Sequence, residues 1–379
     1  MVYGMTIDID DHLVLYRSER FFSAFPSVER LPNGEILLAF RRAPDHRWLF
    51  GKNTEKELNS VDHVHFRSHI ALRRFDAELK PKSAAISMPM HAEAADQDAN
   101  LFLHSSGRLL QHGFLWYPVP HSIAEKMEGA GRSVVRGERL GAGYFFWGSY
   151  IRYSDDHGHT WSDYIDLPVD GAGNVAGGPF SSGAVALRGR MVEMQDGSLL
   201  LAGYAAGGGV TGNQQTSFFT SGNVGETWKR LSQNLAMEGV DLQEPSIAAW
   251  PNGEVSVFHR TRNNGDRLVV SRSKDGQTFR DPKTLEIVGH PYDPLVLPDG
   301  RLFLVYGFRH EPMGVRARVA SSFDGLEAAE EIIIRDDSPS MDTGYPSACL
   351  LADGRILVAY YIADDKGVRG IEGTILSLN

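Results

Sequence analysis

The chain has 379 residues, of which 42% are hydrophobic and 23% charged, and its formal net charge is −10. This composition is typical of a globular protein with a large core, and an acidic chain without a basic stripe argues against nucleic acid as a partner. The single cysteine, Cys349, excludes an intrachain disulfide. The N-terminal residues lack the pattern of a signal peptide and no apolar run reaches a membrane-spanning length, so we expect a cytoplasmic protein without a membrane partner, unless a leader has been removed.

In chain order, the first predicted element is a strand in TIDIDDHLVLYRS (6–18), and six similar repeats follow it. Each repeat has a turn of the form x-Gly-polar and then an apolar strand: LPNGEILLAF, HSSGRLLQHG, MQDGSLLLAG, WPNGEVSVFH, LPDGRLFLVY and LADGRILVAY. Asn-Gly and Asp-Gly supply the positive φ of a tight hairpin turn. The turn glycines, at 34, 107, 197, 253, 300 and 354, are 73, 90, 56, 47 and 54 residues apart, which suits a module of four strands.

Modules of this size cannot each bury a core alone, so we predict an all-β fold in which they close into a six-bladed β-propeller. We expect one domain over residues 1–379, with blades near 20–80, 95–165, 180–232, 243–282, 290–330 and 343–379. The segment 6–18 is expected to add a strand to the last blade and so close the ring. Weak helical signals occur at 55–61 and 121–132.

Two long insertions interrupt the repeats, from Arg42 to Phe66 and from Trp116 to Trp147. Loops of this length in a compact fold are usually functional or disordered. Their histidine and aromatic content favours a functional role, and a packed surface flap is the alternative.

A second repeat follows several blades. It reads SDDHGHTW at 154–161, SGNVGETW at 221–228 and SKDGQTF at 273–279, and a degraded SFDG stands at 322–325. In this Asp-box pattern the Ser and Asp (or Asn) side chains bond the backbone of their own turn, Gly takes the strained φ, and the aromatic residue packs under the hairpin. We therefore expect the boxes to be structural.

Six glycine-turn strands with interleaved Asp boxes resemble the sialidase superfamily of BNR-repeat proteins over nearly the whole chain. The resemblance implies an exo-acting glycoside hydrolase that cleaves a terminal, acidic sugar from a glycan or oligosaccharide with retention, without a cofactor. Sialidases use a Tyr nucleophile, because a neutral phenol is not repelled by a carboxylate substrate. A Glu takes the Tyr proton, an Asp serves as acid and base, and three Arg residues hold the substrate carboxylate.

Three positions resemble the catalytic residues of that family. Tyr345, in DTGYPSACLLADG, resembles the nucleophile, and a buried structural tyrosine is the alternative. Glu244, in DLQEPSIAAWPNG, resembles the base, and burial near the tyrosine is expected to raise its pKa. Asp62, in NSVDHVHF, resembles the acid/base residue, and the flanking His63 and His65 are alternatives as acid, base or sugar ligand.

Two arginines resemble members of the carboxylate-binding triad. Arg260 follows the predicted base by sixteen residues, and Arg262 is its rival on the same strand face. Arg316 precedes the degraded box by six residues, with Arg309 and Arg318 as rivals. The planar guanidinium suits this task because it binds a carboxylate through two parallel hydrogen bonds.

The first blade departs from the family pattern. Sialidases have Arg-Ile-Pro where this chain has Ala24-Phe25-Pro26, so one carboxylate-binding arginine is missing. Arg20 and Arg41 are the candidates to compensate. A glycosidase-type site is therefore better supported than sialic acid as the substrate.

Two other functions stay open. One is a polysaccharide lyase or another glycosidase that uses His63, His65 or His112 together with Tyr345. The other is a non-catalytic carbohydrate-binding propeller, which the missing arginine favours. His63, His65 and His69 would share one face of a strand, but no zinc motif accompanies them, so we predict no metal.

Overall fold

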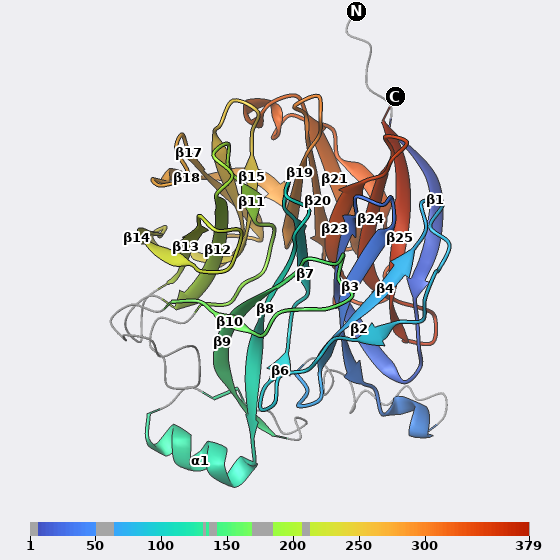
Figure 1. The fold of residues 1–379 in the computed structure, drawn as a ribbon, viewed down its shortest axis with the longest axis vertical. Helices are drawn as coiled ribbons and strands as arrows, with labels where there is room; N and C mark the ends of the chain where they lie inside the picture. Colours follow the sequence, from blue (N-terminus) through green and yellow to red (C-terminus); the bar gives the residue numbers. More distant parts are fainter. Residues whose placement is uncertain are drawn as a thin grey trace, which may run out of the picture.

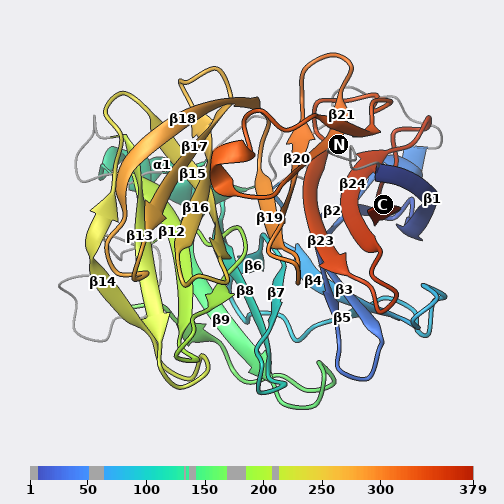
Figure 2. The same cartoon turned by 90° about the horizontal axis from the view of Figure 1, so that it is seen from above.

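The structure is a computed structural model that describes residues 7–50, 64–131, 134–135, 142–168, 185–206 and 213–378. Six antiparallel sheets form a ring of blades around a central axis, so the fold is the predicted six-bladed β-propeller (Figure 1; Figure 2). Within these ranges, no helix is long and apolar enough to cross a membrane.

The first three blades span the N-terminal half of the chain. Blade 1 contains β2 (Phe21–Arg30), β3 (Ile36–Pro44), β4 (His69–Phe75) and β5 (Ile86–Ser87). Blade 2 contains β6 (Ala95–Asp96), β7 (Asn100–Leu103), β8 (Leu109–Val119), β9 (Gly143–Ser154) and β10 (Ile165–Asp166). Blade 3 contains β11 (Val192–Glu193), β12 (Leu199–Ala206), β13 (Gln214–Ser221) and β14 (Lys229–Leu235).

The last three blades complete the ring. Blade 4 contains β15 (Asp241–Ala249), β16 (Val255–Arg262), β17 (Arg267–Ser273) and β18 (Arg280–Val288). Blade 5 contains β19 (Tyr292–Val296), β20 (Leu302–Phe308), β21 (Gly314–Ala320) and β22 (Ile332–Arg335). Blade 6 contains β23 (Gly344–Leu350), β24 (Ile356–Ala363), β25 (Arg369–Leu378) and β1 (Ile7–Tyr16).

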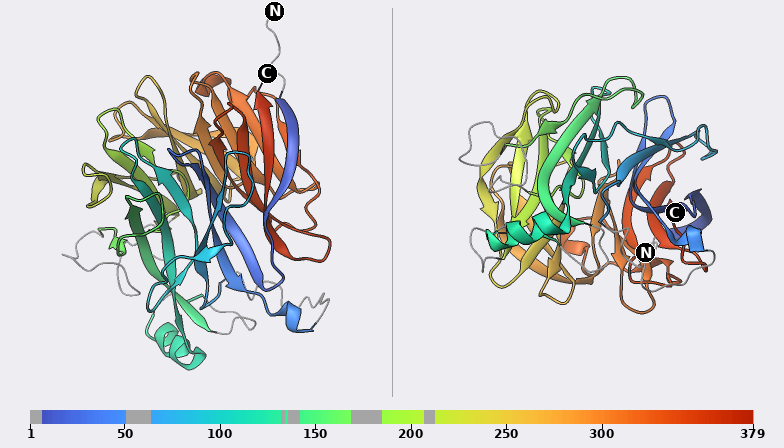
Figure 3. Two further views of the ribbon diagram at one scale, coloured as in Figure 1. Left: turned by 45° about the vertical axis from the view of Figure 1, so that its right-hand side comes forward. Right: turned by 90° about the horizontal axis from the view of Figure 1, so that it is seen from below.

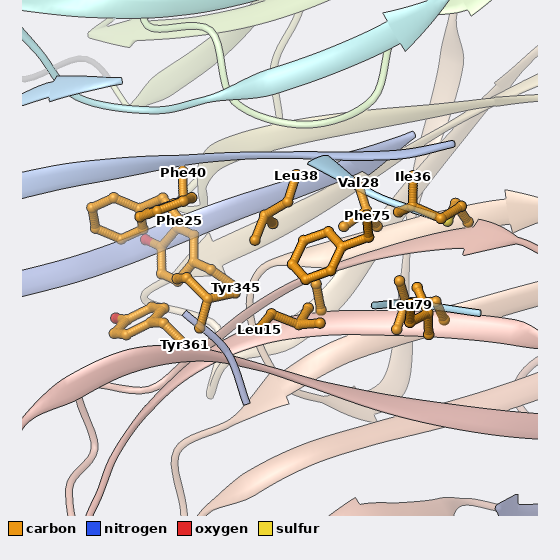
Figure 4. Close-up of a cluster of buried hydrophobic side chains, with 14 of the residues drawn as sticks. Leu15, Phe25, Val28, Ile36, Leu38, Phe40, Phe75, Leu79, Tyr345 and Tyr361 are labelled. Atoms are coloured by element: carbon orange, nitrogen blue, oxygen red, sulfur yellow. The ribbon is translucent and has the colours of Figure 1, made fainter. Parts of the chain in front are cut away.

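The N-terminal strand closes the ring, as predicted for segment 6–18. β1 pairs antiparallel with β25, with Ile7 opposite Leu378. Leu15 of β1 belongs to the apolar cluster between the last and first blades, together with Phe25 and Tyr361 (Figure 4). Because the two ends of the chain share one sheet, the first and last blades cannot separate without breaking that pairing.

The turn glycines and the Asp boxes form as predicted. All six turn glycines have φ between +78° and +90°. In the box of blade 2, the Ser154 hydroxyl accepts the backbone N–H of Gly158 at 2.7 Å, and Asp156 accepts the N–H and hydroxyl of Thr160 at 2.8 and 2.6 Å. Asn223 takes the place of the aspartate in blade 3. The boxes close the turns between the third and fourth strands, at the outer side of the blades.

The second long insertion is an extended hairpin. β8 and β9 run beyond the neighbouring blades and carry helix α1 (His121–Gly129) at their end (Figure 3). Ala124 of α1 is buried against Val119 and Phe145. The predicted helical segment 121–132 thus contains a helix. The segment 55–61 lies outside the described residues, whereas the start of the first insertion forms a short 3-10 helix, Arg47–Phe50; another lies at Phe323–Gly325.

Buried polar groups join the inner strands of adjacent blades. Three serines accept a hydrogen bond from a backbone N–H of an adjacent blade: Ser27 from Leu101, Ser246 from Arg190, and Ser347 from Val28. The Arg190 guanidinium of blade 3 pairs with Asp293 of blade 5 at 2.7 Å and donates to the carbonyl of Ala348 in blade 6 at 2.8 Å. Three blades are therefore held together at the axis by one side chain.

Candidate active site

A cavity of about 680 Å³ lies where the six blades converge. Its wall carries charged groups from blades 2, 4 and 5 and aromatic rings from blades 1, 2, 3 and 6: Asp98, Glu244, Arg260, Arg262, Asp266, Arg309, Phe25, Phe114, Trp116, Tyr204 and Tyr345. A concave site with a few convergent polar groups is the usual form of a small-molecule site.

One position of the repeat supplies four residues of the cavity lining, and a fifth, Arg188, that lies beside Tyr345. In five blades, the residue nine positions before the turn glycine is Phe25, Asp98, Arg188, Glu244 or Tyr345. Phe25, Glu244 and Tyr345 have positive φ of 56°, 45° and 48°, and each lies at a β-bulge of its inner strand. Such backbone is rare for non-glycine residues, and bulges redirect side chains. The repeat thus turns these side chains toward the axis.

Tyr345 and Glu244 meet across the axis from blades 6 and 4. The phenol Oη of Tyr345 donates to Oε1 of Glu244 at 2.5 Å. Arg260 Nη1 donates to Oε2 of the same carboxylate at 3.1 Å and to the tyrosine Oη at 3.0 Å. Phe25 packs on Tyr345, with 4.8 Å between ring centroids (Figure 4). Three of the predicted site residues therefore form one hydrogen-bonded group.

The protonation states within this group differ from the expectation for Glu244. Burial alone would raise its pKa, but Arg260, the hydrogen bond from Tyr345 and Arg188 outweigh that effect and lower the pKa. Burial and the charge of Glu244 raise the pKa of Tyr345 well above its usual range, against the opposing effect of Arg260 and Arg309. The resting pair is a carboxylate and a neutral phenol, so the carboxylate is ready to accept the phenolic proton.

Arg309 is the second arginine beside the tyrosine. Its guanidinium carbon lies 5.2 Å from the centroid of the Tyr345 ring. The side chain is held by the carbonyl of Thr343 and the hydroxyl of Tyr361, both at 3.2 Å. Since Arg309 and Arg260 both line the cavity, they present two cations to a bound molecule.

Arg188 and Asp98 were not predicted from the sequence. The guanidinium of Arg188 lies 5.0 Å from the centroid of the Tyr345 ring, and its Nη1 donates to Asn100 at 2.5 Å. Its Nε is 3.5 Å from the Asp98 carboxylate. Burial raises the pKa of Asp98 to about 7, although the arginine lowers it. Their shared repeat position with Glu244 and Tyr345 was the available signal.

Arg316 does not lie at the cavity, in contrast to the expectation. It is on β21, the third strand of blade 5, where its guanidinium packs 4.7 Å from the Phe308 ring and donates to the carbonyl of Pro312 at 2.8 Å. Arg318, two residues further along the strand, bonds to the hydroxyl of Tyr306. Two strands separate the third strand from the axis. The side chains of Arg316 and Arg318 therefore contact residues of their own blade.

The residues predicted in the first insertion are only partly within the described structure. Asp62 and His63 lie outside the described residues, and Val64, which follows them, lines the cavity. His65 is buried, and its Nδ1 accepts the backbone N–H of Arg67 at 3.0 Å. Burial, with nearby cations, lowers the pKa of His65 to about 4.

The other predicted histidines have structural partners. His112 is completely buried on β8, and its Nε2 contacts the carbonyl of Gly189 at 2.9 Å, which joins blade 2 to blade 3. Burial lowers its pKa to about 4. His69 accepts a hydrogen bond from Arg42 at 3.1 Å. Among the described residues, no group of three or more His, Cys, Asp or Glu side chains is placed to hold a metal ion.

The arginines proposed to replace the missing one contact aromatic rings instead. Arg20 lies over the Trp48 ring at 4.5 Å. Arg41 is completely buried, 6.0 Å from the centroid of the Phe25 ring. Where the family has arginine, this chain has Ala24. The next residue, Phe25, lines the cavity with its aromatic ring.

Comparisons with known proteins match the propeller fold. The chain is similar to a crystal structure of a protein of unknown function from Dyadobacter fermentans, with 31% identity, a TM-score of 0.86, and 98% and 99% of the two chains covered. A K499G mutant of the NanB sialidase of Streptococcus pneumoniae gives 14% identity and a TM-score of 0.66, with 98% of this chain and 71% of that one covered.

A leech intramolecular trans-sialidase in complex with 2,7-anhydro-Neu5Ac gives 13% identity and a TM-score of 0.62, with 99% and 70% of the chains covered. No curated protein sequence matches the chain. Residues 140–358 match the BNR repeat-like domain. The chain belongs to the family of BNR repeat-like proteins, and its propeller fold is similar to that of sialidases.

Proposed function

We propose that the protein is an exo-acting glycoside hydrolase of sialidase type that removes a terminal, acidic sugar from a glycan with retention of configuration. Tyr345 is the nucleophile, Glu244 its base, and Arg260 and Arg309 bind the acidic group of the sugar. The observation that carries the proposal is the 2.5 Å hydrogen bond from a buried phenol to a buried carboxylate at the floor of the cavity.

The charges around this pair support the proposed first step. As the phenol oxygen attacks the anomeric carbon, its proton moves to Glu244, and the bond to the leaving group breaks. Arg260 touches both the carboxylate and the phenol oxygen, so it stabilises negative charge on either one during the transfer. A carboxylate whose pKa is lowered is a weaker base, and the short, prealigned hydrogen bond compensates because the proton has little distance to travel.

The leaving group needs a proton, for which we propose Asp62. It precedes Val64, a residue of the cavity wall, by two positions in the chain. In the second step the same carboxylate takes a proton from water, which attacks the anomeric carbon and releases the tyrosine. The phenol oxygen then recovers its proton from Glu244, and two displacements give net retention.

The test is incubation of the protein with aryl glycosides and acidic oligosaccharides, with products identified by mass spectrometry. We expect release of a terminal acidic sugar by the wild type and loss of that activity in Tyr345→Phe. Tyr306→Phe is the matched control, because its hydroxyl bonds to Glu331 away from the cavity. Release of a neutral sugar that depends on Tyr345 would support the proposed mechanism and refute the proposed specificity for an acidic sugar.

Full activity in Tyr345→Phe would refute the nucleophile. Binding of a glycan without any product would indicate the carbohydrate-binding role instead.

A further inference from the structure

His290 is a buried group of the cavity that the proposed mechanism does not use. It lines the cavity just before β19, and its side chain is only 7% exposed. Its backbone N–H donates to the carbonyl of Gly307 at 2.9 Å, which fixes its position. A buried histidine that faces the substrate cavity requires a functional explanation.

The ring of His290 has one edge turned to Asp266. Its Nδ1 is buried 4.0 Å from Oδ1 of that carboxylate, and has no hydrogen-bond partner among the described residues. Nδ1 is shielded from solvent, which leaves Nε2 as the ring nitrogen available to a molecule in the cavity. The other oxygen of Asp266 is 3.1 Å from Nε2 of His310, a residue of the cavity rim.

The charges that face His290 come from three directions. Arg260 and Glu244 belong to blade 4, Arg309 follows β20 in blade 5, and Asp266 is in the hairpin between β16 and β17. Burial, followed by the two arginines, lowers the pKa of His290 far below its ordinary value, and the two carboxylates oppose this only in part. The ring is therefore neutral while the cavity is empty.

We propose that His290, supported by Asp266, is the third member of the anion-binding group with Arg260 and Arg309, and that it takes up one proton when an acidic sugar binds. It thereby replaces the arginine that is absent at Ala24. This inference rests on the acidic substrate of the proposed function, and it concerns binding and not the chemical step.

The proton comes from solvent and its uptake follows from electrostatic linkage. A bound carboxylate offsets the field of Arg260 and Arg309, so the main cause of the neutral ring besides burial is removed. The protonated ring is then stabilised by the charge of Asp266, 4.0 Å from Nδ1, and donates from Nε2 to the bound anion. Charge-assisted bonds of this type are stronger than neutral ones, so the ligand and the proton favour each other's binding.

The test is isothermal titration calorimetry at pH 5.0 in two buffers of different ionisation enthalpy. N-acetylneuraminic acid and D-glucuronic acid are the probes, and D-glucose is the neutral comparison. At this pH an ordinary histidine is already protonated and takes up nothing, whereas His290 is neutral. We expect wild type to take up close to one proton with an acidic probe. His290→Gln should take up none and bind about tenfold more weakly.

His310→Gln is the matched control, because it changes the other histidine that contacts Asp266; we expect it to retain the proton uptake. The inference is overturned if neither acid binds, if the wild type binds without proton uptake, or if His290→Gln still takes up the proton. It is also overturned if His310→Gln abolishes the uptake. These titrations need no turnover, so absence of glycoside cleavage alone would refute the proposed function and leave this inference standing.

Discussion

The Asp boxes at the outer side of the blades and the ring of residues at the axis come from the same repeat, but only the boxes keep their sequence. Serine and Asp or Asn recur in the boxes of blades 2, 3 and 4, and the serine accepts the glycine N–H in each of them at 2.7 to 2.9 Å. At the axis, one repeat position holds Phe25, Asp98, Arg188, Glu244 and Tyr345.

The difference follows from where the partners of each side chain lie. A box residue bonds to its own turn, so each blade that has a box needs the same residue. An axial residue contacts other blades, so the repeat fixes its backbone and leaves its side chain free to differ. Substitutions at the axis should therefore change chemistry and pH dependence, whereas substitutions in the boxes should change stability alone.

The largest effect is expected for Glu244→Gln. The amide cannot accept the phenolic proton and no longer pairs with Arg260, so kcat should fall about 10²- to 10⁴-fold. Steady-state kinetics on the substrate found for the wild type measures this. Glu254→Gln, the same change at a partly exposed turn of blade 4 away from the cavity, is the control and should retain activity. A loss in Glu244→Gln no larger than in this control would remove Glu244 from the mechanism.

The next effect concerns stability at the axis. Arg190→Met leaves the mostly buried Asp293 without its ion pair and Ala348 without a donor, which should lower the free energy of unfolding by about 3 kcal/mol. Urea unfolding measures the change. Arg355→Met breaks an exposed pair with Asp353 and should cost less than about 1 kcal/mol. Equal losses in the free energy of unfolding would show that the ion pair at the axis stabilises the fold no more than an exposed pair does.

The fold was predictable because its signals are local. Asp-Gly and Asn-Gly turns need only their own residues, and the alternating strand after each turn marks a blade. The closing strand at 6–18 followed from the ring itself. Tyr345 and Glu244 could also be found, because each precedes a glycine-turn strand as the nucleophile and base of the sialidase family do.

The rest of the site depends on contacts that spacing does not contain. Arg309 and Arg316 both belong to blade 5, but only the structure shows that the first faces Tyr345 and the second is bonded within its blade. The pKa of Glu244 depends on the 3.1 Å contact with Arg260, and a sequence gives no such distance. Arg188 and Asp98 stand in no motif of their own, and only the repeat position that they share with Glu244 and Tyr345 marks them in the sequence.

Asp98 allows the axis to be probed by pH. Burial raises its pKa to about 7 in the folded protein, so the folded state binds more protons than the unfolded state between about pH 4 and 7. Its contribution to stability is therefore present at low pH and is lost as the pH rises through 7. Asp98→Asn does not titrate, so its stability relative to the wild type should increase between pH 5 and pH 8.

Urea unfolding of both proteins at the two pH values measures this difference. Asp353→Asn, in an exposed turn where the pKa of the aspartate is lowered, should show no such gain between these pH values. A pH-independent difference between Asp98→Asn and the wild type would mean that Arg188 holds the carboxylate ionised throughout.

The smallest effect belongs to the outer turns. Asp156→Ala removes the acceptor for two backbone N–H groups and for the Thr160 hydroxyl, at an exposed turn, so the free energy of unfolding should fall by about 1 kcal/mol. Asp156→Asn should cost less, because Asn223 makes the corresponding bond to the N–H of Thr227 in blade 3. Thermal unfolding distinguishes the two, and neither should change the kinetics. If Asp156→Ala lost activity while it kept full stability, the outer turn would have to influence the reaction at the axis. That result would contradict the expectation that the boxes affect stability alone.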